Sequence, residues 1–173
     1  MNFKSYYLNL KKIFSDKLLE NDYFSSNVII TEPSDDPRKV LIIFPLNQDI
    51  FRVASYIFRE IPYSKKNAQF HYIIRDDYSD YFNIRNGTLY KVNLMNNKSG
   101  IDFEKFPNNI KFDMVINLNI DWNSNISALM AHVQSNYKIG FKHKDSDLLY
   151  NIQIDITKNG IVEDGYKQIR DLI

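Results

Sequence analysis

Residues 39–61 read KVLIIFPLNQDIFRVASYIFREI. The first six residues are a short, continuous apolar run, which is typical of a strand covered on both faces, as in a parallel sheet. A loop at residues 45–49 follows, and apolar side chains then recur at helical spacing from Ile50 to Ile61. The stretch therefore predicts a strand, a loop and a helix in succession, the repeating unit of parallel α/β sheets.

The same alternation continues along the chain. We expect further strands at residues 69–74, 88–94, 112–118, 137–141 and 149–156, and helices at residues 124–134 and 160–173. Residues 77–82 can form a short helix, and residues 96–109 form a loop or contain at most one turn of helix. Such alternation predicts parallel pairing with right-handed crossovers, helices on both faces, and ligand access at the carboxyl ends of the strands. The predicted fold is Rossmann-like, a three-layer α/β/α arrangement around a mainly parallel sheet.

The N-terminal part of the chain has a different character. Residues 2–20 place apolar side chains at helical spacing with lysines between them, which predicts an amphipathic helix. Its apolar stripe can pack on the domain, or it can dock on a membrane surface or on another protein. Residues 31–38 contain Pro33 and Pro37 and predict a connector. We therefore expect residues 1–38 to form the helix and connector, and residues 39–173 to form one Rossmann-like domain.

Composition narrows the class of protein. The chain has 173 residues, 44% hydrophobic and 25% charged, which is ordinary for a globular protein. Lys and Arg total 22 against 21 for Asp and Glu, so no overall field favours nucleic acid. Cysteine is absent and no stretch approaches the roughly 20 apolar residues that span a bilayer, so we expect a cytoplasmic protein without a transmembrane segment. A protein partner or a second copy fits this composition, with peripheral membrane contact through the N-terminal helix.

Several familiar chemistries lack their motifs. The loop after the first strand contains no glycine, which excludes a GxGxxG dinucleotide site there, and neither a GxxxxGK[ST] nor a GxSxG pattern occurs. The three histidines, His71, His132 and His143, are too far apart in the sequence to suggest a metal site. We expect no cofactor and no metal, and interpret His71 and His132 as structural or solvent-exposed residues.

Candidate site residues lie in the two loops that follow strands 39–44 and 112–118. Asp49 stands near the start of the following helix, where a carboxylate can act as a base toward a ligand or simply cap the helix. Trp122, the only tryptophan, can stack on a sugar or base, or cover apolar residues under its loop. Asn47, Gln48 and Asn119 complete the set of candidate ligand-binding residues, because the carboxyl ends of parallel strands share one edge of the sheet.

Three segments together resemble family-nine glycosyltransferases, the heptosyltransferases of lipopolysaccharide synthesis. Residues 39–50 with a helix ending at residues 60–62 (EIP) resemble the start of that family, and the later segments are residues 112–118 (FDMVINL), 127–131 (SALMA) and 137–141 (YKIGF). Their order and spacing agree as well, over residues 39–155. The chain is also similar to small, uncharacterised single-domain bacterial proteins that share the lysine-containing N-terminal helix, the Phe-Asp strand and the Lys-Ile-Gly segment.

The resemblance implies half of an enzyme. Family members have the GT-B architecture, in which two Rossmann-like halves close over a cleft and the second half holds the nucleotide sugar. This chain resembles the N-terminal, acceptor-side half. Asp49 matches the Asp of a Gly-Asp pair that acts as base toward the acceptor sugar, with Gln48 in place of the glycine.

Two functions follow as expectations. The first is a non-catalytic glycosyltransferase-like domain that binds a protein partner or a small ligand; the replaced glycine and the missing donor lobe favour it, because positioning supplies much of a transferase's rate. The second is a component of a GT-B glycosyltransferase whose donor lobe is a separate chain, with Asp49 as the base.

Overall fold

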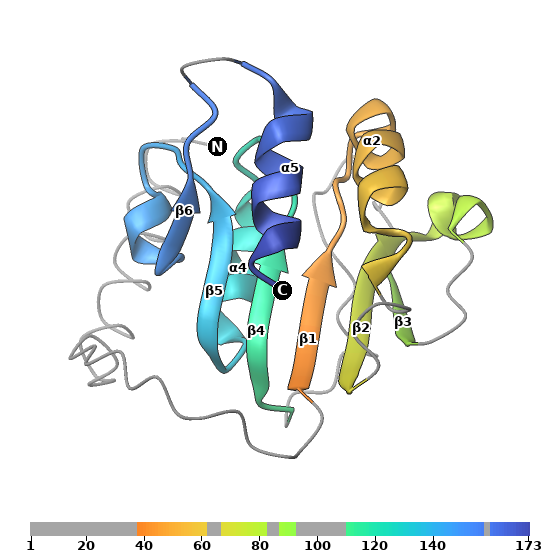
Figure 1. Cartoon of the computed structure of the whole chain (residues 1–173). Coiled ribbons are helices and arrows are strands. Elements are labelled where there is room, and N and C mark those ends of the chain that lie inside the picture. The colour runs from red at the N-terminus through yellow and green to blue at the C-terminus, as the bar shows by residue number, and fades with distance from the viewer. Residues whose placement is uncertain (1–37, 62–66, 83–86, 93–109, 158–159) are drawn as a thin grey trace, which may run out of the picture. The chain divides into compact units, whose positions relative to one another are not determined.

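The computed structural model describes residues 38–61, 67–82, 87–92, 110–157 and 160–173 (Figure 1). Residues 36–173 form one compact unit. Its elements, in chain order, are β1 (Arg38–Ile43), α2 (Gln48–Phe58), β2 (Ala68–Arg75), the 3₁₀ turn η1 (Asp76–Tyr81), β3 (Thr88–Val92), β4 (Phe112–Asn117), α4 (Ser124–His132), β5 (Ser135–Phe141), the 3₁₀ turn η2 (Ser146–Leu148), β6 (Ile152–Ile154) and α5 (Val162–Asp171). The predicted N-terminal helix, residues 31–37 of the connector and the loop at residues 96–109 lie outside the described residues.

The six strands form one sheet in the order β3-β2-β1-β4-β5-β6, and every pair is parallel. From β1 the chain moves outward through β2 to β3, then returns to place β4 on the other side of β1. Ile43 at the end of β1 is therefore in register with both Ile73 of β2 and Asn117 of β4. The direction of winding reverses between β1 and β4, which is where open α/β sheets place their ligands.

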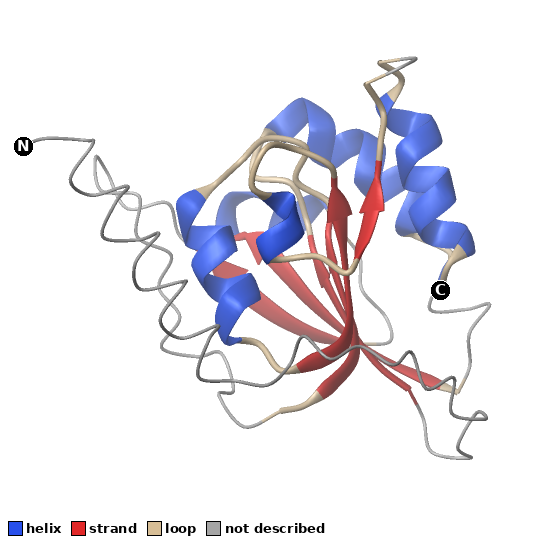
Figure 2. Cartoon of the chain, turned by 90° about the vertical axis from the view of Figure 1, so that its left-hand side faces the viewer, coloured by secondary structure: helices blue, strands red, loops and turns tan. Residues whose placement is uncertain are grey.

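Helices cover both faces of the sheet, which confirms the predicted three-layer, Rossmann-like fold. Helices α2 and α5 lie together on one face and α4 lies on the other (Figures 1 and 2). The side chains that face α2 and α5 come from alternate strand positions, because successive residues of a strand point to opposite faces. The buried cluster on this face includes Val40, Ile42 and Phe44 from the first strand and its end, Phe51, Ala54 and Phe58 from α2, and Tyr166 and Ile169 from α5.

One predicted strand is much shorter than expected. The sequence predicts a strand over residues 149–156, but β6 covers only Ile152–Ile154. Leu149 and Tyr150 are buried at the end of η2 instead, and the backbone N–H of Tyr150 donates to the carbonyl of Ser146 at 2.9 Å. A tight turn thus buries the apolar residues that suggested a strand. The spacing of apolar residues in such a short run does not distinguish a buried turn from a buried strand.

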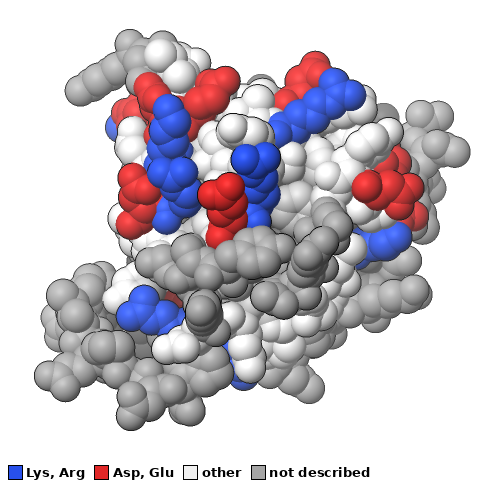
Figure 3. All heavy atoms as spheres, turned by 45° about the vertical axis from the view of Figure 1, so that its right-hand side comes forward, with Lys and Arg blue, Asp and Glu red and all other residues white. Residues whose placement is uncertain are grey.

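Charged side chains of both signs are mixed on one face of the described part of the chain. Figure 3, which brings the right-hand side of Figure 1 forward, shows basic and acidic groups side by side over the described part of this face. Arg52 pairs with Asp49 and Lys91 with Asp76, at 3.7 and 3.0 Å. No described helix is both long and apolar enough to pass through a membrane.

Candidate functional site

A cavity of about 260 Å³ lies at the carboxyl edge of the sheet, between the loops that follow β1 and β4. It is lined by Pro45, Leu46, Asn47, Ile50, Asn119, Ile120, Asp121, Trp122 and Asn123. These residues come from the two strands between which the winding reverses, so the cavity lies where the fold predicts a ligand. The predicted residues Asn47, Asn119 and Trp122 meet in it.

The wall formed by the loop after β1 depends on Asn47. This residue caps α2: its side-chain oxygen accepts hydrogen bonds from the backbone N–H groups of Asp49 and Ile50 at 2.9 and 3.2 Å. Capping uses the oxygen and leaves the amide nitrogen. The cap of this helix is therefore Asn47 and not Asp49.

The wall formed by the loop after β4 has the same construction. Asn123 caps α4, and its side-chain oxygen accepts from the N–H groups of Asn125 and Ile126 at 3.0 and 3.1 Å. Within the described part of the chain, the amide nitrogens of Asn47 and Asn123 have no hydrogen-bond acceptor. Two helix N-termini from opposite faces of the sheet, each with an amide donor, thus border one cavity.

Asn119 holds the two loops together. Its side-chain oxygen accepts from the backbone N–H of Leu46 at 3.0 Å, and its amide nitrogen donates to the Asn117 side-chain oxygen at 2.8 Å and to the carbonyl of Phe44 at 3.4 Å. Asn119 is 9% exposed, so these bonds form away from bulk solvent. Both amide hydrogens are used, which makes Asn119 a part of the cavity floor with one oxygen lone pair left for a ligand.

The floor is supported in turn by a tyrosine from outside the lining. Asn117, 4% exposed, donates from its amide nitrogen to the Tyr150 hydroxyl oxygen at 2.6 Å. Burial raises the pKa of Tyr150, although the hydrogen bond from Asn117 opposes this shift, so the hydroxyl is neutral at physiological pH. The Tyr150 ring lies over Gly140, where a Cβ atom would be 2.5 Å from Cζ of the ring.

Trp122 forms the exposed side of the cavity. Its side chain is 43% exposed, and its ring meets the His143 ring edge to face, with centroids 4.7 Å apart and planes at 81°. The His143 ring also contacts the Tyr150 ring edge to face, with centroids 6.1 Å apart and planes at 77°. Burial lowers the pKa of His143, and the carboxylate of Asp145 opposes this, so the imidazole is neutral at pH 7.

Two predicted residues do not line the cavity. The Asp49 side chain is 90% exposed and lies 3.7 Å from Arg52, in the first turn of α2, where the helix dipole favours a carboxylate. Gln48 borders a separate hollow of about 590 Å³, which is lined by residues of α2 and η1. The loop therefore presents Asn47 to the cavity, while Gln48 and Asp49 face elsewhere.

Two of the histidines, His71 and His132, do not line the cavity. His71 is 8% exposed in β2, and its Nδ1 is 3.1 Å from the Tyr90 hydroxyl, while burial lowers its pKa. His132 occupies the last turn of α4. Among the described residues, no group of three His, Cys, Asp or Glu side chains is placed to hold a metal ion.

The lining has a definite chemical character. None of the described residues that line the cavity is a lysine or arginine, and Asp121 supplies the one carboxylate. Two amide donors, one carboxylate acceptor and an indole ring complement neighbouring hydroxyl groups on a ligand with an apolar face. Four residues of this site were not predicted from the sequence: Asp121, Asn123, Asn117 and Tyr150. Asp121 and Asn123 are neighbours of Trp122 in its loop and could have been found from it, whereas the roles of Asn117 and Tyr150 depend on tertiary contacts.

The sequence matches no protein-family model and no curated protein. The fold is similar to a glycosyl transferase family 9 structure from Veillonella parvula DSM 2008, with a TM-score of 0.59, 16% identity, and coverage of 80% of this chain and 42% of that chain. It is also similar to the E. coli heptosyltransferase WaaC, solved with ADP, with a TM-score of 0.55, 12% identity, and coverage of 78% and 46%. This chain thus spans less than half the length of either, and its fold resembles part of these family-nine structures, in agreement with the resemblance of its sequence motifs.

Proposed function

We propose that this chain is a glycosyltransferase-like binding domain, which holds a neutral saccharide unit in the cavity between the β1 and β4 loops and does not itself catalyse transfer. The observation that carries the proposal is the lining: the Trp122 ring, the Asn47 and Asn123 amides and the Asp121 carboxylate border one cavity, and none of its described lining residues is cationic. A volume of about 260 Å³ is just below the range of about 300–1,000 Å³ typical of small-molecule sites, which suits a single sugar ring.

The position of Asp49 supports the non-catalytic part of the proposal. A general base must be within about 3 Å of the proton that it removes, or reach it through one water molecule. Asp49 is not part of the cavity lining, and its carboxylate points into solvent beside Arg52. A ligand in the cavity therefore contacts Asn47 before it reaches Asp49.

The single tryptophan gives a direct test. Because Trp122 is the only tryptophan in the chain, its fluorescence reports on the cavity without a label. We expect a saturable change in emission on titration with at least one of glucose, galactose, mannose and N-acetylglucosamine, and none with inorganic phosphate. A response to phosphate alone, or to none of these probes, contradicts the proposal.

Matched variants locate the binding site. Asn47→Asp and Asn123→Asp keep the oxygen that caps each helix but remove the amide donor, so both variants should fold while binding the sugar about tenfold more weakly. Asn136→Asp makes the same chemical change at an exposed residue outside the lining and should bind normally. Equal weakening in all three variants would mean that added charge, and not the lost donor, explains the effect.

The alternative is that the chain forms an enzyme together with a separate donor-binding chain, with Asp49 as the base. The similar structures support it, since they extend well beyond the part that this chain matches. On this alternative, purification from the native cell should yield a stoichiometric second chain that binds a nucleotide sugar, and Asp49→Asn should abolish transfer by that complex. Transfer at the normal rate by the Asp49→Asn complex would eliminate the base.

A further inference from the structure

We propose that residues 142–151, which connect β5 to β6, set the ligand affinity of the cavity from outside it, with His143 and Tyr150 as positioning residues. This inference rests on the proposed binding function. None of these ten residues belongs to the lining. They support it at two separate points, the exposed wall and the buried floor.

The exposed wall is supported through His143. The ring of His143 contacts both Trp122 and Tyr150, with centroid distances of 4.7 and 6.1 Å and planes at 81° and 77°. Edge-to-face aromatic contacts of this kind restrict the orientation of both rings. An indole that stacks on a sugar must keep a fixed ring orientation, and the contact with His143 restricts the orientation of the Trp122 ring.

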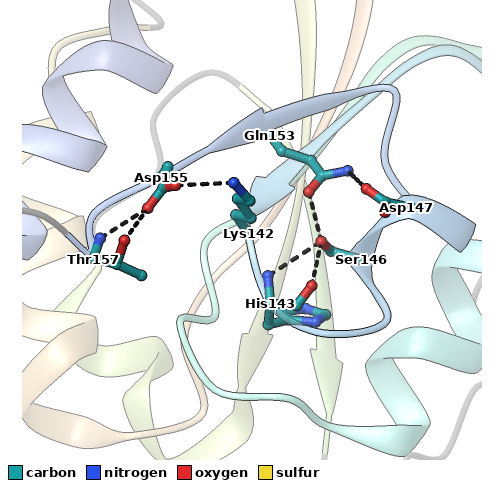
Figure 4. Close-up of polar contacts among 7 residues, drawn as sticks. All are labelled: Lys142, His143, Ser146, Asp147, Gln153, Asp155 and Thr157. Atoms are coloured by element: carbon teal, nitrogen blue, oxygen red, sulfur yellow. Dashed lines mark hydrogen bonds and ion pairs between the residues drawn. The ribbon is translucent and has the colours of Figure 1, made fainter.

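A hydrogen-bonded turn fixes His143 itself. Ser146 is fully buried; its hydroxyl donates to the carbonyl of His143 at 2.8 Å and accepts from the backbone N–H of His143 at 3.1 Å. Figure 4 shows this turn held to β6, where the Gln153 side-chain oxygen is 2.6 Å from the Ser146 hydroxyl and the Gln153 amide donates to Asp147 at 2.7 Å. The Ser146 hydroxyl therefore fixes both the N–H and the carbonyl of His143, and the Gln153 side chain connects this turn to β6.

The buried floor is supported through Tyr150. Hydrogen bonds run without interruption from the Tyr150 hydroxyl to Asn117, from Asn117 to Asn119, and from Asn119 to the backbone N–H of Leu46. This series of hydrogen bonds begins at Tyr150, continues through Asn117 of β4 and Asn119, and ends in the loop after β1 at Leu46, which lines the cavity. Since every amide in it is oriented by the next, loss of the Tyr150 hydroxyl leaves the Asn117 amide without its buried partner.

Both supports are local to this side of the sheet, which allows a matched control. Tyr90 in β3 also presents its hydroxyl to a partly buried polar side chain, His71, at 3.1 Å, but it lies at the opposite edge of the sheet from β6. Tyr90→Phe and Tyr150→Phe therefore remove the same atom from comparable hydrogen bonds. Only the hydrogen bond of Tyr150 belongs to the series that ends at the cavity lining.

The experiment is a calorimetric titration of the full chain with the sugar that gives the strongest Trp122 response. We expect Tyr150→Phe to weaken binding about threefold to tenfold, the ratio that corresponds to one lost hydrogen bond, and Tyr90→Phe to leave affinity unchanged. His143→Ala should weaken binding similarly, and His143→Phe should restore it, because phenylalanine retains a ring edge against the indole. Normal affinity in Tyr150→Phe, equal loss in Tyr90→Phe, or failure of His143→Phe to restore binding each overturns the inference.

A second measurement separates this inference from the proposed function. If wild-type protein binds none of the sugars, the function fails, yet the support of the floor can still be observed in the free protein. Tyr150→Phe should shift the side-chain amide signals of Asn119 in a ¹⁵N correlation spectrum, whereas Tyr90→Phe should not. Unchanged Asn119 signals in Tyr150→Phe would overturn the positioning role irrespective of any ligand.

Discussion

Replacement of Gly140 by alanine should destabilise the protein through one side chain. An added Cβ would lie 2.5 Å from Cζ of Tyr150 and 2.7 Å from both of its Cε atoms, whereas ordinary van der Waals contact begins at 3.4 Å. Gly140 is in β5, between paired strands, so its backbone is fixed and the ring must move by about 1 Å. That movement pulls the hydroxyl away from Asn117, which it contacts at 2.6 Å.

The cost combines overpacking with a lost buried hydrogen bond. Overpacking typically costs about 1–3 kcal/mol and the hydrogen bond about 1 kcal/mol, so we expect a loss of about 2–4 kcal/mol in the free energy of unfolding. For a chain of this size the melting temperature should fall by about 5–15 °C. Urea unfolding followed by Trp122 fluorescence measures the loss directly, and the slope of the transition should not change.

A second background tests whether Tyr150 is the cause. In a Tyr150→Leu protein the side chain over Gly140 is smaller and carries no hydroxyl, so Gly140→Ala should cost less than about 1 kcal/mol there. The two substitutions are then strongly non-additive. A full loss in that background, or a loss below about 0.5 kcal/mol in the wild-type background, would refute the steric reasoning.

Three further outcomes follow from single contacts. Gly165→Ala should lower the unfolding free energy by about 1–3 kcal/mol, measured by thermal melting, because a Cβ there would lie 2.6 Å from the Phe141 ring. Hydrogen bonds from the Thr157 hydroxyl and N–H hold the pKa of Asp155 below its ordinary value of 3.8. The stabilising contribution of the Asp155 carboxylate is therefore complete above pH 3.8 and is lost as the pH falls further. A carbon-detected titration of Asp155 should show the lowered midpoint, and Thr157→Val should raise that midpoint. Burial lowers the pKa of His143 below 6.5, so protonation destabilises the fold as the pH falls below 6.5; Trp122 fluorescence should change with a midpoint below that value, and His143→Phe should remove the change.

The strands and helices followed from local patterns where the sequence is strongly periodic. The apolar run at residues 39–44 became β1, and the spacing from Ile50 onward became α2, whose start at Gln48 depends on the Asn47 cap. Parallel pairing followed from alternation. The order of the strands in the sheet could not be predicted from local patterns, because it depends on contacts between segments such as β1 and β4 that are more than 70 residues apart.

The candidate site was predictable only in part. The position of two loops at one sheet edge brings Asn47, Asn119 and Trp122 together, but side-chain direction within the first turn of α2 separates Asp49 from them. Tyr150 was interpreted as part of a strand because its apolar neighbours alternate. Its contact with Gly140 depends on the turn before β6, which the pattern of residues does not encode.

The hydrogen bond between Leu46 and Asn119 joins residues 73 positions apart in the chain. The cavity consequently forms only when β1 and β4 pair, and closing this long loop costs conformational entropy. A sugar that binds the proposed site therefore binds the folded protein and not the unfolded chain. Such a sugar should therefore lower the unfolding rate and leave the refolding rate unchanged.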